Sequence, residues 1–174
     1  SNPNSLKLIK SNPKYKFLKI NICNPKIKKI ITSFKPNVIF HLAAESHVDK
    51  SILKADNFIK SNINGTFHLL KICNDYLYKN NINDFRFIHV STDEVYGSKS
   101  LNSAKSKETD PYEPNSPYSA SKAASDHLVR AWFKTYNFPA IITHSSNNYG
   151  PWQNEEKFIP VIIKSLIKRN FIPI

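Results

Sequence analysis

The stretch FRFIHV at residues 85–90, followed directly by STDEVYG at residues 91–97, decides the fold expected for this chain. The first six residues are mostly apolar and rich in aromatic and β-branched types, which predicts a strand buried in a parallel sheet. A hydroxyl and two carboxylates follow where that strand ends, at Thr92, Asp93 and Glu94. Ligands of open α/β sheets bind outside the carboxyl ends of the strands, so these three side chains are expected to line one crevice.

Working outward, the neighbouring segments have strand-like and helix-like patterns. Strands are predicted over residues 15–20, 37–43 and 140–146, the second of them buried on both faces, and helices over residues 25–35, 55–78, 116–136 and 161–168. Gly65, inside the second helix, is expected to permit close packing. The polar, proline-containing stretch 98–115 is predicted to be a surface loop that borders the site.

Two further reactive side chains, Tyr118 and Lys122, stand one turn apart on one face of a predicted helix. An ammonium group beside a phenol favours the phenolate, so Lys122 is expected to lower the pKa of Tyr118 and prepare it to act as a base. Taken alone, this spacing is common in helices that have no catalytic role. Thr92, Asp93 and Glu94 could equally be a helix N-cap followed by first-turn acids.

Composition narrows the class of protein. At 174 residues the chain is long enough for one domain with a core, and its longest apolar run is too short for a membrane helix. No signal peptide is recognisable, and two cysteines predict free thiols in a reducing, cytoplasmic compartment. The net charge of +12 comes from scattered lysines without an arginine-rich run, so we expect a solvated surface and no nucleic-acid partner. No histidine or cysteine spacing indicates a metal site.

Four segments together carry a family resemblance: HLAAESHVD at 41–49, STDEVYG at 91–97, PYSASK at 117–122 and SNNYGP at 146–151. They resemble the dTDP-glucose 4,6-dehydratases, a family of extended short-chain dehydrogenases/reductases, and the resemblance runs over nearly the whole chain. The adjacent pair Asp93 and Glu94 is the specific part, because related epimerases and decarboxylases share the Tyr118 and Lys122 pattern but lack the two acids.

The resemblance implies an NAD-dependent lyase that converts dTDP-glucose to its 4-keto-6-deoxy product in deoxysugar biosynthesis, such as a rhamnose pathway. It implies that Tyr118 deprotonates the C4 hydroxyl as hydride leaves C4, while Thr92 hydrogen-bonds the same oxygen. Lys122 then lowers the pKa of Tyr118 and holds the ribose. Glu94 removes the C5 proton, and Asp93 protonates the departing C6 hydroxyl.

Binding residues are also implied by the resemblance. The cofactor is expected to contact Tyr118, Lys122, Ile22, Leu42, Ala43, Ala44, Ser46, Ser61 and Asn148. The substrate is expected to contact Ser46, Thr92, Asn147, Glu156, Lys157 and Phe158. Two positions depart from the family pattern, with Asn21 where an Asp is usual and Ser145 where a Cys is common.

The resemblance further implies a doubly wound, Rossmann-like parallel sheet of the α/β class that lacks the first two strands and most of the C-terminal substrate domain. Residues 1–150 would form a partial NAD-binding domain, and residues 151–174 would begin the sugar-nucleotide region. The chain has three glycines and no G-x-x-G-x-x-G loop, which usually cradles the pyrophosphate. Because removal of neighbouring strands exposes sheet edges, we expect these residues alone to be unstable and to bind NAD weakly.

Three alternative functions are compatible with the sequence. The chain could belong to a sugar-nucleotide 4-epimerase or decarboxylase, which would tolerate loss of the two acids. It could instead be a non-catalytic fragment kept for binding or assembly, or a basic binding domain whose DNA affinity falls with salt. The resemblance also implies a homodimer, because members of the family often dimerise through two long helices.

Overall fold

The structure, a computed structural model, describes residues 3–100 and 102–172. They form two compact units. The larger unit is Ile20–Ser146, and the smaller unit joins the segment up to Lys19 with the segment from Asn147 onward. The domain division after residue 150 stays a prediction, and the division seen here falls after Ser146.

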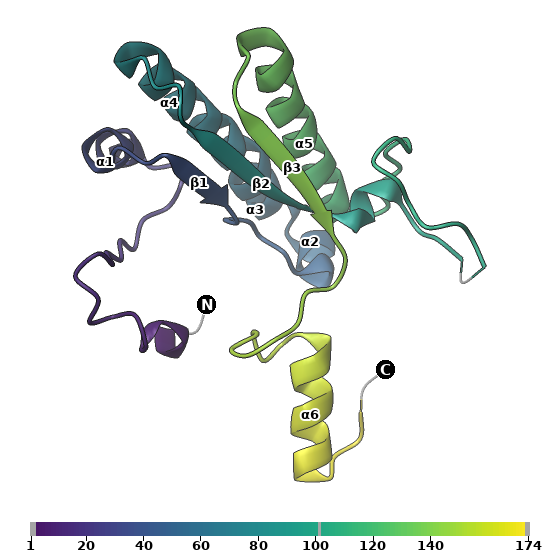
Figure 1. Ribbon diagram of the computed structural model, residues 1–174. Coiled ribbons are helices and arrows are strands. Elements are labelled where there is room, and N and C mark those ends of the chain that lie inside the picture. Colours follow the sequence, from purple (N-terminus) through teal and green to yellow (C-terminus); the bar gives the residue numbers. More distant parts are fainter. Residues whose placement is uncertain (1–2, 101, 173–174) are drawn as a thin grey trace. The chain divides into compact units, whose positions relative to one another are not determined.

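A three-stranded parallel sheet is the centre of the larger unit (Figure 1). Its strands are β1 (Val38–His41), β2 (Arg86–Thr92) and β3 (Ala140–Ser145), in the order β1-β2-β3. The register places Thr92 opposite Ser145, and His41 opposite His89. Because all three strands run the same way, their carboxyl ends lie at one edge of the sheet, as predicted for the segment after residue 90.

Helices connect the strands in the predicted order. The bounds are α1 Lys26–Phe34, α2 Val48–Leu53, α3 Ala55–Phe58, a π-helical turn η2 Ile59–Asn64, α4 Gly65–Asn80, a 3₁₀ turn η3 Asp93–Tyr96, and α5 Pro117–Tyr136. The long helix predicted over residues 55–78 is therefore confirmed as the run from α3 to α4, with a π-helical turn inside it. The described residues of the stretch 98–115 form no helix or strand, as expected for a loop.

The core lies between the sheet and the helices α1, α4 and α5. Leu70, Phe85, Phe87, Val129 and Phe138 are all 1 % exposed or less, and they form one continuous apolar cluster. Burial of aromatic and aliphatic side chains of this size is the main stabilising term of such a fold. In Figure 1 the helices α4 and α5 lie behind the strands, on the side where this cluster forms.

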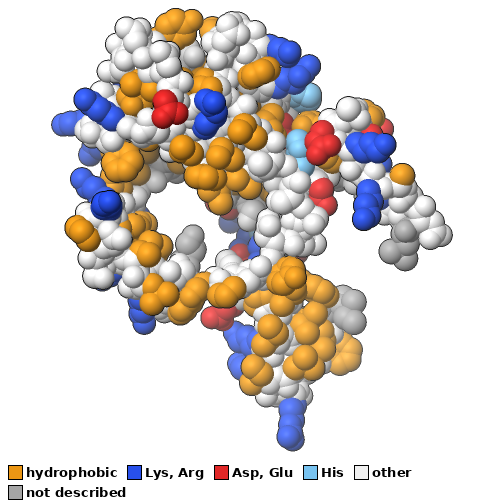
Figure 2. Space-filling model, viewed as in Figure 1, with side chains coloured by type: hydrophobic (Ala, Val, Ile, Leu, Met, Phe, Trp, Pro, Cys, Tyr) orange, Lys and Arg blue, Asp and Glu red, His pale blue; other side chains and the backbone are white. Residues whose placement is uncertain are grey.

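The other face of the sheet is uncovered within the described residues. Val38, Phe40 and Ile141 are 47 %, 63 % and 49 % exposed, and Figure 2 shows hydrophobic side chains gathered over the strands. The prediction that the strand at residues 37–43 is buried on both faces is wrong here. Alternate side chains of a strand point to opposite faces, and these helices cover only one of them.

The strand predicted over residues 15–20 is also wrong. These residues have no regular secondary structure and pair with no strand in the part of the chain that the structure describes. A β-strand is stabilised by its ladder and by cross-strand contacts, so an apolar alternating segment without a neighbour stays irregular.

The smaller unit contains a short 3₁₀ turn, η1 (Pro3–Leu6), and α6 (Phe158–Lys168). The helix starts before its predicted position at residue 161 and has no buried residue. Leu166 and Ile167 are 61 % and 78 % exposed. Among the described residues, no helix is both long and apolar enough to cross a membrane.

Candidate active site

The polar triplet at the end of β2 forms a tight turn. Thr92 is the last residue of the strand and the N-cap of η3, where its Oγ1 accepts a hydrogen bond from the Glu94 backbone N at 3.3 Å. Thr92 is buried, Glu94 is half-buried and Asp93 is exposed. The capping interpretation of the triplet is thus confirmed. A capping role does not exclude a catalytic role for the triplet, because the cap also fixes the backbone positions of Asp93 and Glu94.

Gly97 ends this turn with φ +81°, a conformation that favours glycine. A Cβ atom at this position would come within 2.6 Å of the Glu113 carbonyl oxygen. The loop before α5 can therefore approach η3 closely only because residue 97 has no side chain.

A capping box positions the start of α5. Ser116 Oγ accepts from the Ser119 backbone N at 3.0 Å, and Ser119 Oγ accepts from the Ser116 backbone N at 3.0 Å. Pro117 at the first helical position adds a preset φ angle. Tyr118 and Lys122 consequently stand in the first turns of a well-defined helix that packs against β2.

Lys122 is buried beneath the sheet edge. Only 5 % of the residue is exposed, and its Nζ donates to the Val90 carbonyl oxygen at 2.7 Å. Burial lowers the pKa of Lys122, while the Asp126 carboxylate one turn away acts to raise it. The ammonium therefore stays close to the end of β2, without solvent to satisfy it.

Tyr118 faces the strand-end triplet. Burial raises its pKa, and the Glu94 and Asp93 carboxylates raise it further, whereas a hydrogen bond with Thr92 lowers it. Its ring meets Phe58 edge to face at 6.3 Å. The structure thus brings Thr92, Asp93, Glu94 and Tyr118 together, but the expected lowering of the Tyr118 pKa by Lys122 is not met. Spacing along a helix could not reveal either the burial of the phenol or its acidic neighbours.

Asn62 is a structural member of this region that was not among the predicted site residues. It is 1 % exposed in the π-helical turn, and its side chain bonds both backbone groups of Glu45, at 2.8 and 3.0 Å. Its Nδ2 also donates to Ser121 Oγ at 2.9 Å. Asn62 therefore ties the loop after β1 to α5. A polar residue on the otherwise apolar face of a predicted helix was the signal that could have found it.

The segment expected to lie along a cofactor follows β1. Leu42 is 66 % exposed, Ala43 and Ser46 are exposed, and Ala44 is half-buried, all outside helices and strands. Ser61 is half-buried in η2. Ile22 packs against Gly65 of α4, where a Cβ would lie 2.9 Å from Ile22 Cγ1, so the close packing expected of this glycine is confirmed.

Comparison with known proteins decides the family. The model of the GDP-mannose 4,6 dehydratase family matches residues 2–170. The chain belongs to this family. It is 48 % identical to the dTDP-glucose 4,6-dehydratase of Haemophilus influenzae, over 100 % of this chain and 53 % of the relative. It is 46 % identical to that of Neisseria meningitidis serogroup B, over 99 % of this chain and 50 % of the relative.

Solved structures agree with this membership. A dTDP-glucose 4,6-dehydratase from Streptomyces venezuelae with NAD bound has a TM-score of 0.87 and 39 % identity, over 99 % of this chain and 51 % of that chain. A UDP-glucuronic acid 4-epimerase from Bacillus cereus with NAD has a TM-score of 0.86 and 27 % identity, over 97 % of this chain and 51 % of that chain. The resemblance and the Rossmann-like α/β fold class are therefore confirmed. The chain spans about half the length of these relatives.

Five of the residues predicted to bind cofactor or substrate belong to the smaller unit of this family member: Asn147, Asn148, Glu156, Lys157 and Phe158. Asn148 O accepts from Gln153 Nε2 at 2.9 Å, and Glu156 Oε1 accepts from Asn154 Nδ2 at 3.1 Å. Phe158 begins α6 and is 63 % exposed. Their binding roles stay predictions. Within the described residues no group of three or more metal-ligating side chains is present.

Proposed function

We propose that the complete protein containing this chain removes water from a nucleotide sugar of the dTDP-glucose type, with NAD as cofactor. The meeting of the Tyr118 phenol with Thr92, Asp93 and Glu94 at the end of β2 carries the proposal. One base for an alcohol and two carboxylates for an elimination are the groups that such a reaction needs. The relatives are dTDP-glucose 4,6-dehydratases, which supports the same substrate class.

The residues after β1 fit part of a dinucleotide. Ala43 and Ala44 leave the backbone open, and the exposed Leu42 offers an apolar surface to a flat ring. Lys122 supplies a cation near the same edge, suited to ribose hydroxyls. No glycine-rich loop of this sequence fits the pyrophosphate. NAD bound there would supply a hydride acceptor that can later act as a hydride donor.

Tyr118 is assigned the proton of the C4 hydroxyl. Because its pKa is raised, the phenol is protonated at neutral pH, and it becomes the phenolate base by releasing its own proton to solvent before it takes the proton of the C4 hydroxyl. The hydrogen bond with Thr92 opposes the raised pKa and points the phenol oxygen towards the triplet. Thr92 is thus assigned both orientation of Tyr118 and stabilisation of the charged oxygen.

The carboxylate pair is assigned the loss of water. A carbonyl at C4 acidifies the C5 proton, which Glu94 removes as the half-buried base. Asp93 is exposed, and its Oδ1 accepts a hydrogen bond from Thr92 Oγ1 at 3.4 Å. Asp93 protonates the leaving C6 hydroxyl. Two adjacent acids in different environments can hold different protonation states, which this division of roles requires.

The test is conversion of dTDP-glucose by the purified complete gene product, followed by mass spectrometry. Loss of one water, with a 4-keto-6-deoxy sugar as product, supports the proposal. Glu94→Gln should abolish this loss, whereas the matched change Glu113→Gln in the exposed loop should leave it intact. A product of unchanged mass with altered C4 configuration would instead support the epimerase alternative, and substantial turnover by Glu94→Gln would refute the role of Glu94.

We also propose that the protein is a cytoplasmic homodimer that pairs through α4 and α5. Apolar side chains of these helices remain open to solvent, including Phe67 at 45 %, Phe133 at 47 % and Tyr78 at 69 %. Exposed aromatic surface on two neighbouring helices is a frequent basis of subunit contacts. Light scattering of the complete gene product measures this state directly.

A further inference from the structure

Asp126 is a buried charge that the proposed mechanism does not use. It lies on α5 four residues after Lys122 and eight after Tyr118, so the three side chains share one face of the helix. Asp126 is 1 % exposed. Burial alone would raise its pKa, but hydrogen bonds from His144 and His89 outweigh that effect and hold the pKa at about 2. The carboxylate is therefore charged at neutral pH.

Contacts from three other segments surround this carboxylate. Its Oδ2 accepts from Ser91 Oγ of β2 at 2.8 Å, and lies 3.1 Å from His144 Nε2 of β3. Tyr112 of the preceding loop donates to the same oxygen at 3.3 Å. Asp126 Oδ1 lies 3.1 Å from His89 Nε2, which is also 3.2 Å from Ser125 Oγ.

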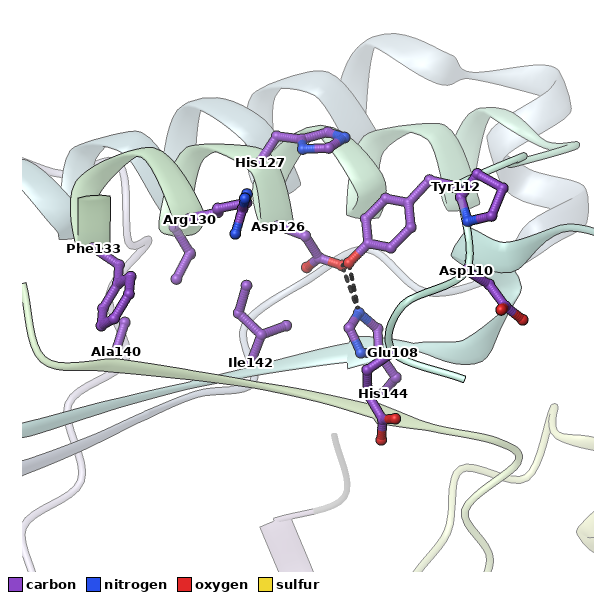
Figure 3. A pocket seen from close by; sticks show the side chains of 12 residues that line it. Glu108, Asp110, Tyr112, Asp126, His127, Arg130, Phe133, Ala140, Ile142 and His144 are labelled. Atoms are coloured by element: carbon purple, nitrogen blue, oxygen red, sulfur yellow. Dashed lines mark hydrogen bonds and ion pairs between the residues drawn. The ribbon is translucent and has the colours of Figure 1, made fainter. Parts of the chain in front are cut away.

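Figure 3 shows the ends of Asp126, Tyr112 and His144 converging beside a pocket of about 630 Å³ between α5, β3 and the loop at residues 108–112. Although Asp126 lines this pocket, its neighbours shield it, and the hydrogen bonds to its carboxylate come from protein groups that all meet Oδ2. The carboxylate thus joins α5 to β2, to β3 and to the loop at a single point.

Such an arrangement is costly if its only purpose is stability. Apolar side chains of similar volume often stabilise a fold as well as a buried charge network does. This network lies directly behind the reactive groups, since Ser91 precedes Thr92 in the chain and Lys122 is one helical turn from Asp126. The position favours a role in the geometry of the site.

We propose that Asp126 is a positioning residue that holds the end of β2, through Ser91, against the Tyr118 and Lys122 face of α5. The inference rests on the proposed function, because it assigns to Asp126 the support of the same reacting groups. It also assigns a charge effect, since the Asp126 carboxylate raises the pKa of both Lys122 and Tyr118.

The effect of the Asp126 charge on Lys122 can be separated from the effects of the other charged groups around the site. Glu94 and Asp93 of η3 act on Tyr118 in the same direction as Asp126. His41 of β1 and His89 of β2 face Lys122, but burial lowers the pKa of both, that of His41 to about 3. These two imidazoles are neutral near pH 7, so Asp126 is the fixed negative charge that acts on Lys122.

The test compares Asp126→Asn with the wild-type complete gene product. Asparagine keeps the shape and removes the charge, so the pKa of Tyr118 and of Lys122 should both fall. The pH profile of kcat should therefore move to lower pH on both limbs, while kcat drops by about tenfold to a hundredfold and KM stays within about twofold. NAD affinity, measured by binding without substrate, should fall by about threefold or more, because the Lys122 ammonium loses the nearby carboxylate that favours its charged form.

Two further variants separate the explanations. Ser91→Ala breaks the link to β2 without changing charge, so it should lower kcat and leave the pH profile in place, which keeps the proposal testable if Asp126→Asn folds poorly. Asp75→Asn, a half-buried carboxylate of α4 outside the network, is the matched control and should behave as wild type.

The outcomes distinguish the two proposals. An inactive wild-type protein overturns the proposed function. The NAD affinity of Asp126→Asn then shows whether Asp126 has the positioning role. An Asp126→Asn protein with wild-type NAD affinity and an unshifted profile overturns the positioning role. Full activity of Ser91→Ala would overturn that role as well, since the link through Ser91 would then hold nothing in place.

Discussion

At the scale of single residues, the Thr92 side chain makes two contacts that matter for the site. Its hydroxyl caps η3 through the Glu94 backbone N and hydrogen-bonds Tyr118. The first contact sets the backbone turn that presents the two acids, and the second acts on the base itself. One side chain therefore couples the geometry of the elimination groups to the protonation of the phenol.

Replacement of Thr92 by valine should raise the pKa of Tyr118, because the hydrogen bond that lowers it is lost while burial and Glu94 remain. The acid limb of the kcat profile should then move to higher pH, opposite to the shift expected for Asp126→Asn. Thr92→Ser keeps a hydroxyl and should retain the wild-type profile. A valine variant whose acid limb stays in place would remove the assigned role of Thr92 in Tyr118 ionisation.

Residue types that follow local rules could be placed from sequence. Thr92, Asp93, Glu94 and Tyr118 meet as expected because strand ends share an edge and helix turns repeat every 3.6 residues. The contacts of Asp126 and Asn62 could not be found this way. Their partners lie between 14 and 59 residues away in the chain, and no local pattern specifies which distant side chains a buried polar group will meet.

At the scale of elements, α5 supplies Tyr118 and Lys122, and its start is fixed by the Ser116 and Ser119 capping box. Ser116→Ala should cost about 1 kcal/mol of unfolding free energy, because the Ser119 backbone N–H loses its acceptor, Ser116 Oγ. Urea unfolding of the complete gene product measures the change. Thr135→Ala, at an exposed position near the other end of α5, is the control and should change stability little.

A capping loss should also reach the site. Tyr118 is two residues beyond the cap, so fraying of the first turn would loosen the phenol before it loosened the rest of the helix. We therefore expect Ser116→Ala to lower kcat by a few fold at a temperature where the protein remains folded. Unchanged stability and unchanged kcat together would show that the box contributes nothing beyond what Pro117 supplies.

Helices and strands with strong periodicity were predictable, whereas elements that depend on partners were not. The segment at residues 15–20 has a strand pattern but no neighbour to pair with among the described residues. The π-helical turn at Ile59–Asn64 follows no periodic signal, because it accommodates the side chain of Asn62 between Glu45 and Ser121. Tertiary contacts decided these elements, and tertiary contacts are absent from a sequence pattern.

At the scale of the whole molecule, the helices cover one face of the sheet, and the other face is uncovered within residues 3–100 and 102–172. The covered face owes its core to α1, α4 and α5, and the uncovered face presents Val38, Phe40 and Ile141. Apolar patches of this kind favour association. The expectation that these 174 residues alone are unstable stays a prediction.

The buried imidazoles should make the larger unit sensitive to acid. Burial lowers the pKa of His41 from 6.5 to about 3, with His89 and the Lys122 ammonium adding to the effect. Below pH 6.5 the unfolded chain gains a proton at His41 that the folded chain does not. Folding stability that is fully present above pH 6.5 is therefore lost as the pH falls towards 3.

His41→Gln should flatten this dependence. The variant cannot take up a proton at residue 41, so the slope of unfolding free energy against pH between 6.5 and 3 should decrease by about 1.4 kcal/mol per pH unit. Its stability at pH 7 can fall as well, because the contact of His41 Nε2 with Thr66 Oγ1 at 2.9 Å changes, and only the slope tests the prediction. Urea unfolding of the complete gene product at several pH values measures this slope. His127→Gln, at an exposed position of α5, is the control. Parallel slopes for wild type and His41→Gln would mean that His41 gains its proton in the folded state, which its burial against His89 and Lys122 argues against.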